Sequence, residues 1–121
     1  MKALQKYADG PGHLALREVD EPGCPPDRVK VAVAYCGICG TDLHVREDTF
    51  PNNPPVVLGH EFSGTVVAVG AEVDRLTAGD RVAVLGSSEI TCGRCIHCRT
   101  GDYMFCAERR GMGHGTDGGM R

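Results

Sequence analysis

Four closely spaced cysteines are the residues of this sequence with the clearest chemistry. They are Cys92, Cys95, Cys98 and Cys106. The two-residue gaps between the first three let the backbone curl so that successive sulfurs face one point, and the longer last gap lets the chain return to close a fourth corner. A zinc ion with a structural role takes four thiolates in a closed tetrahedron. The spacing therefore predicts a structural zinc site.

Two other interpretations of these cysteines are disfavoured. Disulfides need an oxidising compartment, whereas the chain has an odd total of seven cysteines and no apolar secretory run at Met1–Tyr7. The ferredoxin pattern of an iron–sulfur cluster has three residues before its last cysteine and a proline after it. Here seven residues separate Cys98 from Cys106, and Ala107 follows. His97 is interpreted as a surface residue, because sulfur already fills all four corners.

The segment that holds these cysteines, about residues 90–108, has few aliphatic side chains to bury. In small zinc domains the bound ion contributes on the order of 10 kcal/mol of apparent free energy. We therefore expect zinc to take the place of a hydrophobic core in this segment, which we call the cysteine lobe.

A second group of possible metal ligands is divided between two segments. The first is Gly-Ile-Cys-Gly-Thr-Asp-Leu-His, residues 37–44, and the second is Gly-His-Glu, residues 59–61. A catalytic zinc ion needs three protein ligands and an open position for water or substrate, and thiolate, imidazole and carboxylate groups all suit it. The two segments can make such a site only if the fold joins them.

The elements that must position these residues are predicted to be mostly strands. The chain has 17 Gly and 7 Pro in 121 residues, which favours short strands and tight turns over long helices. The hydrophobic pattern and the turn signals predict five strands, at residues 2–7, 13–19, 28–35, 62–69 and 81–85. Strands of this length and spacing are typical of a barrel or sandwich. The predicted fold class is mainly β, with a small α contribution (α+β).

The strand at residues 28–35 has the clearest alternation of apolar and smaller or polar side chains. The apolar face is predicted to consist of Val29, Val31, Val33 and Tyr35. One short helix is expected after Gly40, where the oxygen of Thr41 or Asp42 would cap it. This helix is predicted to run through Leu43–Val45.

The length of the chain, 121 residues, suits one domain and is too short for the two-domain body of most nicotinamide-dependent enzymes. Residues 111–121 contain five glycines and no periodicity, so we expect the chain to end as if truncated, without a strand or helix to anchor it. No Gly-x-Gly-x-x-Gly fingerprint lies between a strand and a helix, so no cofactor-binding residue is assigned.

The composition limits the classes of partner. A formal charge of -3 and the lack of a stripe of basic and aromatic residues argue against nucleic acid. No stretch approaches the ~20 apolar residues of a membrane helix. We expect no membrane partner and, by default, a cytoplasmic location.

The motifs in this chain resemble those of the zinc-containing medium-chain dehydrogenases. Gly-Ile-Cys-Gly-Thr-Asp-x-His, Gly-His-Glu-Phe-x-Gly-x-Val and Gly-Asp-Arg-Val precede the four cysteines in the order seen in that family, at residues 37–44, 59–66 and 79–82. The match covers nearly the whole chain and is most similar to the sorbitol, threonine and butanediol dehydrogenases.

The resemblance implies a GroES-like, partly open β-barrel over residues 1–121. In the family a Rossmann domain that binds NAD or NADP follows this barrel, and that domain is absent from these residues. The resemblance implies oxidation of a small alcohol or polyol to a ketone, in an enzyme that is a homo-dimer or tetramer. The chain alone is expected to be inactive and monomeric, because a remaining zinc ligand and the cofactor domain lie outside it.

The resemblance also implies roles for individual residues. Cys39 and His60 would bind the catalytic zinc, Glu61 would be a ligand or a close neighbour, and Asp42 would orient His60. Thr41 would meet the substrate hydroxyl, and His44 would pass its proton to solvent. Simpler roles stay open, since Thr41 can act only as a helix cap and His44 can be an ordinary exposed histidine.

Two cysteines, Cys24 and Cys36, have no assigned ligand partner and are interpreted as small buried or loop thiols. Two alternative functions remain beside the dehydrogenase: a stand-alone structural zinc scaffold without redox activity, and a thiol-based redox or iron–sulfur module. The number of zinc ions bound by each chain separates them, since the dehydrogenase predicts two zinc sites, structural and catalytic.

Overall fold

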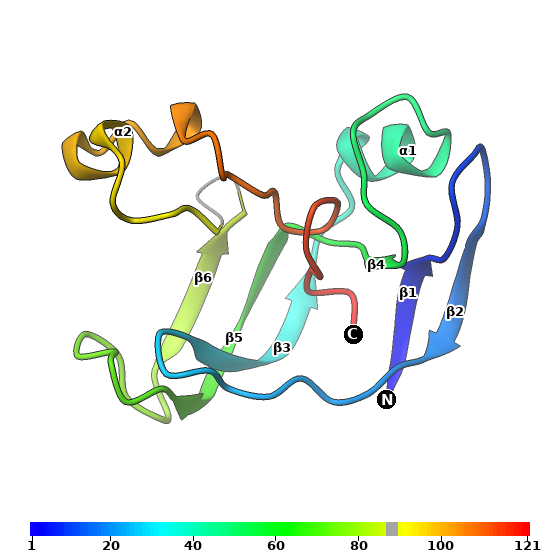
Figure 1. Ribbon diagram of the computed structural model, residues 1–121. Helices are drawn as coiled ribbons and strands as arrows, with labels where there is room; N and C mark the ends of the chain where they lie inside the picture. Colours follow the sequence, from blue (N-terminus) through cyan, green and yellow to red (C-terminus); the bar gives the residue numbers. More distant parts are fainter. Residues whose placement is uncertain (87–89) are drawn as a thin grey trace.

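The computed structural model of the chain describes residues 1–86 and 90–121. Its strands form two antiparallel sheets of three strands each, shown in Figure 1. The first sheet has the order β2-β1-β4, with β1 at Lys2–Lys6, β2 at Leu14–Glu18 and β4 at Val56–Val57. The second has the order β3-β5-β6, with β3 at Val29–Cys36, β5 at Glu61–Val69 and β6 at Arg81–Leu85. The prediction of a mainly β, open architecture is confirmed.

All five predicted strands are present with ends that differ by at most one residue from the prediction. The structure adds β4, whose two residues are too short to show any periodicity. It also has three short helical elements, α1 at Gly40–Arg46, α2 at Ile96–Thr100 and the 3-10 turn η1 at Tyr103–Phe105. Only the first of these was predicted.

The predicted face of β3 is wrong at one residue. Val29, Val31 and Val33 are half-buried, but Tyr35 is 80% exposed. Val33 pairs with Gly64 of β5. Tyr35, two residues further along β3, pairs with Ser63, which is only one residue from Gly64, so β3 has one extra residue at this point. This bulge rotates the end of the strand and turns Tyr35 out of the apolar face.

The predicted cap of α1 is also wrong. The helix begins two or three residues earlier than expected, with Cys39 as its N-cap. Asp42 lies at the third helical position, and its Oδ2 accepts a hydrogen bond of 2.8 Å from the backbone N–H of Cys39. The carboxylate thus satisfies a free donor from within the first turn, as in a capping box.

Residues 111–121 contain no strand or helix, as expected, but backbone hydrogen bonds that were not predicted anchor this C-terminal segment. Gly118 N–H donates to Val57 O at 2.8 Å, and Met120 N–H donates to Leu58 O at 2.9 Å. Met120 O in turn accepts from Leu4 N–H at 2.9 Å. The segment therefore lies between the two sheets (Figure 1, red) and bonds to the backbone that leads out of β4. The sequence did not predict this anchoring, because glycines have no side chains and so show no hydrophobic periodicity.

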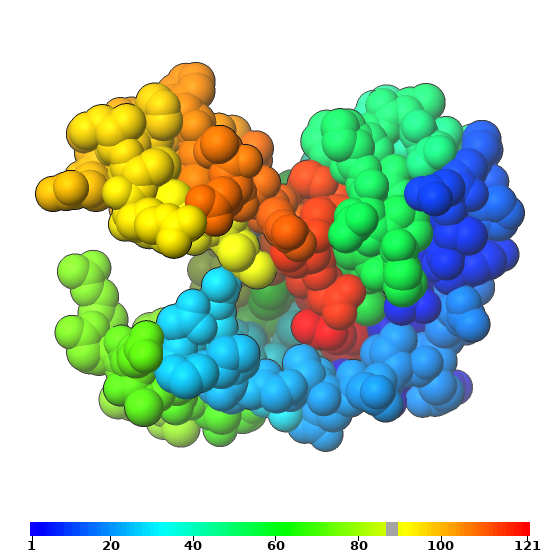
Figure 2. Space-filling view, in the orientation of Figure 1, coloured from blue at the N-terminus to red at the C-terminus, as the bar shows by residue number. Residues whose placement is uncertain are grey.

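Most of the buried apolar side chains lie around the first sheet and α1, and Val66, on β5, is an exception. Those with about 1% exposure are Ala3, Val45, Val56, Val57, Leu58 and Val66. In the space-filling view the cysteine lobe (yellow and orange) and the α1 segment (blue-green) are separate projections, with the C-terminal segment between them (Figure 2). Within residues 1–86 and 90–121, none of the helices has the length and apolar character needed to cross a bilayer.

Candidate metal centres

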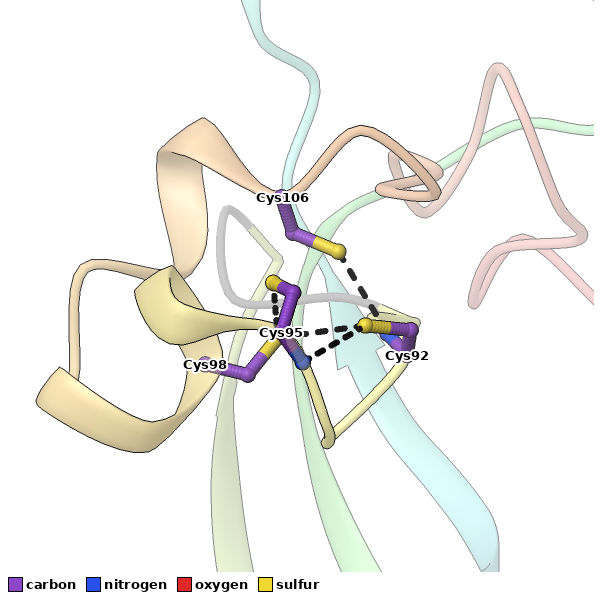
Figure 3. A group of neighbouring side chains, drawn as sticks. All are labelled: Cys92, Cys95, Cys98 and Cys106. Carbon is purple, nitrogen blue, oxygen red and sulfur yellow. Dashed lines mark hydrogen bonds between the residues drawn. The ribbon is translucent and has the colours of Figure 1, made fainter.

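The four cysteines of the lobe converge, as Figure 3 shows. One sulfur from each residue lies within 4.8 Å of the other three. Cys98 Sγ is 3.8 Å from Cys92 Sγ and 3.5 Å from Cys95 Sγ, which makes Cys98 the central residue of the cluster. Cys98 and Cys106 are buried, and all seven cysteines of the chain are free thiols. Four soft donors at this spacing match the closed tetrahedral set that zinc prefers.

Backbone N–H groups also point at these sulfurs. Cys92 N–H donates to Cys106 Sγ, and Cys95 N–H donates to Cys92 Sγ, each at 3.4 Å. The N–H groups of Arg94 and Cys95 lower the pKa of the Cys92 thiol to about 6. The backbone N–H of Cys98 lowers the pKa of Cys95, but desolvation and proton sharing with the other thiols outweigh it and raise that pKa to about 11. Cys92 is therefore the first of the two to become the thiolate that a metal needs.

Short local elements shape the lobe. Cys95 is the N-cap of α2, and Gly101 ends the helix with a left-handed φ of 87°, a conformation that glycine adopts without strain. A β-bridge between Ile90 and Arg110 closes the base of the lobe. His97 is exposed and its ring lies 5.7 Å from that of Phe105, so it does not join the sulfurs.

The second candidate site joins the two segments that the sequence keeps apart. Ligand atoms of Cys39, His60 and Glu61 all lie within 4.8 Å of one another. Cys39 precedes α1, and Glu61 is the first residue of β5, with His60 directly before it. Gly37 N–H donates to Glu61 O at 2.7 Å, which ties the two segments together at the site. Cys39 and His60 are half-buried and Glu61 is exposed, so one side of this group is open.

Asp42 connects these ligands to each other. Its side chain is only 6% exposed, and while Oδ2 accepts from Cys39 N–H, Oδ1 lies 3.7 Å from His60 Nδ1. A carboxylate at this nitrogen favours the tautomer in which the proton is on Nδ1 and the lone pair on Nε2 faces a metal.

The two residues predicted to move a proton lie further along the same helix. Thr41 Oγ1 is 3.8 Å from Cys39 Sγ, at the candidate site. His44 is exposed on α1, and its Nδ1 lies 3.3 Å from Thr49 Oγ1. The structure thus places Thr41 at the candidate site, whereas the His44 ring contacts Thr49. Thr49 was missed, because a threonine in a loop carries no recognisable spacing.

The loop that ends in His60 has a close-packed support that the sequence did not reveal. Gly59 has a φ of 95°, and Gly119 N–H donates to Gly59 O at 2.9 Å. A Cβ atom on Gly118 would lie 1.9 Å from Gly59 O, so only glycine fits there. Cys36 Sγ lies beside the same loop, where burial, followed by the charge of Asp42, raises the pKa of its thiol.

Replacement of Asp42 by asparagine tests the contact with His60. The amide oxygen of Asp42→Asn can still accept from Cys39 N–H, but the charge that faces His60 is lost. We expect zinc affinity at the Cys39–His60–Glu61 site to fall ~10–100-fold, the usual effect of losing a partner behind a metal-bound histidine. The measurement is a zinc titration with a competing chelator. Asp20→Asn, at an exposed residue, is the control and should leave the zinc affinity of both metal sites unchanged. Equal zinc affinities of the two variants at the Cys39–His60–Glu61 site would contradict the role of Asp42.

The chain matches the family model described as the alcohol dehydrogenase GroES-like domain over residues 25–121. It is 46% identical over 121 residues to a sorbitol dehydrogenase of Halalkalibacterium halodurans, covering 98% of this chain and 34% of the relative. It is 44% identical over 122 residues to an L-threonine 3-dehydrogenase of Streptomyces avermitilis, covering 98% of this chain and 35% of the relative.

Solved structures agree with the sequence matches. A cobalt- and zinc-bound thermostable alcohol dehydrogenase from Pyrobaculum aerophilum superposes with a TM-score of 0.83 at 31% identity, covering 98% of this chain and 36% of that one. The chain spans about a third of the length of the curated relatives it matches.

Proposed function

The chain belongs to the alcohol dehydrogenase GroES-like domain family, and from that premise we propose that residues 1–121 are the metal-binding catalytic domain of a zinc-dependent NAD(P) alcohol or polyol dehydrogenase. In this proposal the cysteine lobe holds a structural zinc ion and Cys39, His60 and Glu61 hold a catalytic one. The substrate class is a small secondary alcohol or polyol, which is oxidised to a ketone by hydride transfer.

The proposal rests on the group of Cys39, His60 and Glu61, which is separate from the cysteine lobe and open on one side. Their donor atoms lie within 4.8 Å of one another, and the set combines a thiolate, an imidazole and a carboxylate. A structural zinc site uses closed sets of four ligands, whereas a catalytic site uses three protein ligands and leaves a position open. The exposed side of this group supports the second kind.

The residues around the group suit proton transfer from an alcohol. A zinc ion held there would supply a Lewis acid that lowers the pKa of the substrate hydroxyl. Thr41 Oγ1, beside Cys39 Sγ, can accept that proton and donate its own. His44 lies three residues on, on the same side of α1 and exposed, so its imidazole can exchange the proton with water near neutral pH. Asp42 holds His60 in place throughout.

The hydride acceptor would bind outside these residues. No strand-turn-helix with a Gly-x-Gly-x-x-Gly fingerprint occurs in the sequence of residues 1–121. We therefore expect no turnover from residues 1–121 alone, and we assign NAD or NADP to the whole enzyme without naming contacts.

The number of bound zinc ions tests this proposal directly. We expect two zinc ions per chain by elemental analysis after removal of loosely bound metal, one at each centre. A single ion held by the cysteine lobe would favour a structural scaffold without redox chemistry. No tightly bound zinc at all, or a coloured iron-containing product, would contradict the proposal.

A further inference from the structure

Among residues 1–86 and 90–121, Lys6 is the largest fully buried side chain, with 0% of its surface exposed. It lies on β1 in the first sheet, where a lysine would ordinarily be expected at the surface. Burial of an ammonium group is costly unless hydrogen bonds and an opposite charge replace its water. The groups that surround the Lys6 ammonium therefore indicate its structural role.

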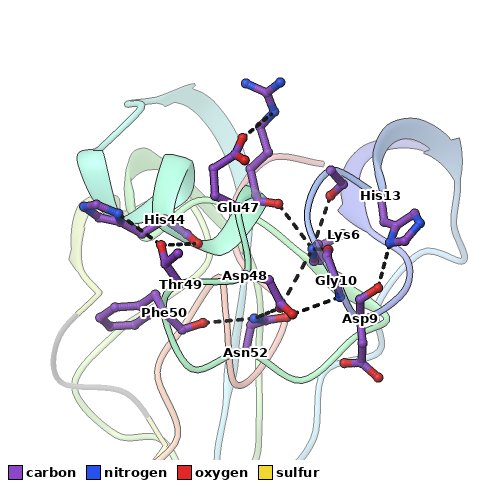
Figure 4. Close-up of polar contacts among 12 residues, drawn as sticks. Lys6, Asp9, Gly10, His13, His44, Glu47, Asp48, Thr49, Phe50 and Asn52 are labelled. Atoms are coloured by element: carbon purple, nitrogen blue, oxygen red, sulfur yellow. Dashed lines mark hydrogen bonds and ion pairs between the residues drawn. The ribbon is translucent and has the colours of Figure 1, made fainter.

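The Lys6 ammonium is fully paired, as Figure 4 shows. Its Nζ donates to Gly10 O, to Gly12 O at 3.2 Å and to Arg46 O at 3.3 Å, which uses all of its donors. Asp48 Oδ1 lies 3.9 Å from the same nitrogen and balances the charge. We call this arrangement the Lys6 cage.

The cage joins the turn between β1 and β2 to the end of α1. Arg46 is the last residue of α1, where backbone carbonyls have no partner within the helix. Its carbonyl accepts from both Lys6 Nζ and Gly12 N–H, the latter at 2.8 Å. A positive charge at this end also interacts favourably with the helix dipole. Asp48 Oδ2 extends the link by accepting from Gly10 N–H at 2.9 Å.

The opposite end of α1 is the candidate catalytic site. Cys39 precedes the helix, and Asp42 in its first turn faces both Cys39 and His60. The seven residues of α1 make a rigid rod only ~10 Å long. A change in the contacts that hold its last turn must therefore displace its first turn.

We propose that Lys6 is a positioning residue for the catalytic metal site, acting through α1 on Cys39 and Asp42. This inference rests on the proposed function, because it assumes that Cys39, His60 and Glu61 bind a metal ion. Lys6 itself touches neither the ligands nor the substrate. Its role is to fix the last turn of the helix that Cys39 caps and that contains Asp42. The cysteine lobe, which is a separate projection, should not depend on it (Figure 2).

Cobalt(II) binding to Lys6→Met and the wild type tests this role. Methionine fills similar space but leaves the carbonyls of the cage unpaired. We expect cobalt affinity at the Cys39 site to fall about tenfold, by analogy with other partners that hold metal ligands in place, and its absorption bands to shift. The thiolate bands of the four-cysteine site should be unchanged. Lys2→Met, at an exposed residue of the same strand, should match the wild type at both sites.

Hydrogen exchange in the same proteins separates local from global effects. In Lys6→Met the amides of Glu47 and Asp48, which bond to Leu43 O and Val45 O, should lose protection while those between β3 and β5 keep it. If Lys6→Met fails to fold, Asp48→Ala, which removes the opposite charge, is the deciding variant. Its cobalt affinity at the Cys39 site is expected to fall about threefold, the size of effect of a partly exposed ion pair.

The outcomes distinguish this inference from the function it rests on. A wild type without a second cobalt site would overturn both. If the wild type has the second cobalt site and a folded Lys6→Met variant binds cobalt there with unchanged affinity, the role of Lys6 alone would be overturned. The same holds for unchanged affinity in Asp48→Ala when Lys6→Met does not fold.

Discussion

Replacement of Cys98 by serine is expected to release zinc from the cysteine lobe and unfold it. Cys98 is buried, and its sulfur is the one that lies near both Cys92 Sγ and Cys95 Sγ. The lobe has few apolar side chains in its interior, and Ile96, Met104 and Phe105 are exposed. Its stability therefore depends on the ion, whose contribution in small zinc domains is on the order of 10 kcal/mol. Zinc content and the loss of helical signal with temperature would measure the effect.

Two variants are controls for Cys98→Ser. Cys24→Ser changes a half-buried thiol outside both clusters whose sulfur donates to Arg28 O at 3.4 Å, a bond that serine can keep. His44→Ala changes an exposed residue of α1. Both should retain the lobe zinc and the thermal stability of the wild type. An equal loss of thermal stability in Cys98→Ser and His44→Ala would contradict the division between a structural and a chemical site.

Replacement of His60 by alanine should remove one zinc ion and leave the other. The site would keep only Cys39 and Glu61 from this chain, and Glu61 is exposed. Loss of a partner behind a ligand already lowers affinity ~10–100-fold, so loss of the imidazole itself should lower it by more than about 100-fold. Elemental analysis should give one zinc ion per chain, and thiol titration should show the lobe cysteines still protected.

His97→Ala is the matched control for His60→Ala. It removes a histidine that lies between two lobe cysteines and is exposed, so two zinc ions should remain. A loss of lobe zinc in this variant would mean that His97 is a ligand, and retention of two ions in His60→Ala would place the second ion elsewhere.

Much of the fold was predictable because its signals are local. The alternation in the strands and the glycine-rich turns located β1, β2, β3, β5 and β6 closely. The lobe was predictable for the same reason, since its four sulfurs come from one short segment with a regular spacing. The resemblance to zinc-containing medium-chain dehydrogenases is confirmed by the family match.

The features that the sequence did not reveal depend on contacts between distant segments. Residue spacing alone did not join Cys39 to His60, which only the family resemblance assigned to one site. In the structure, the hydrogen bond from Gly37 N–H to Glu61 O brings their two segments together. A lysine in a strand looks like a surface residue until its cage is seen, and Lys6 is completely buried. The bulge that exposes Tyr35 comes from its register with β5, which no alternation within β3 encodes.

The anchoring of the C-terminal segment beside His60 also bears on the order in which the two centres form. In the lobe, ligands are joined by local contacts such as that between Cys92 and Cys106, 14 residues apart. The strand before His60 is held by Asp117, whose Oδ1 accepts from Val57 N–H across 60 residues. Closing a longer loop costs more chain entropy, and distant contacts form later in folding. A nascent chain can therefore load its lobe as soon as that segment emerges from the ribosome, whereas the Cys39 site must await the segment around Asp117.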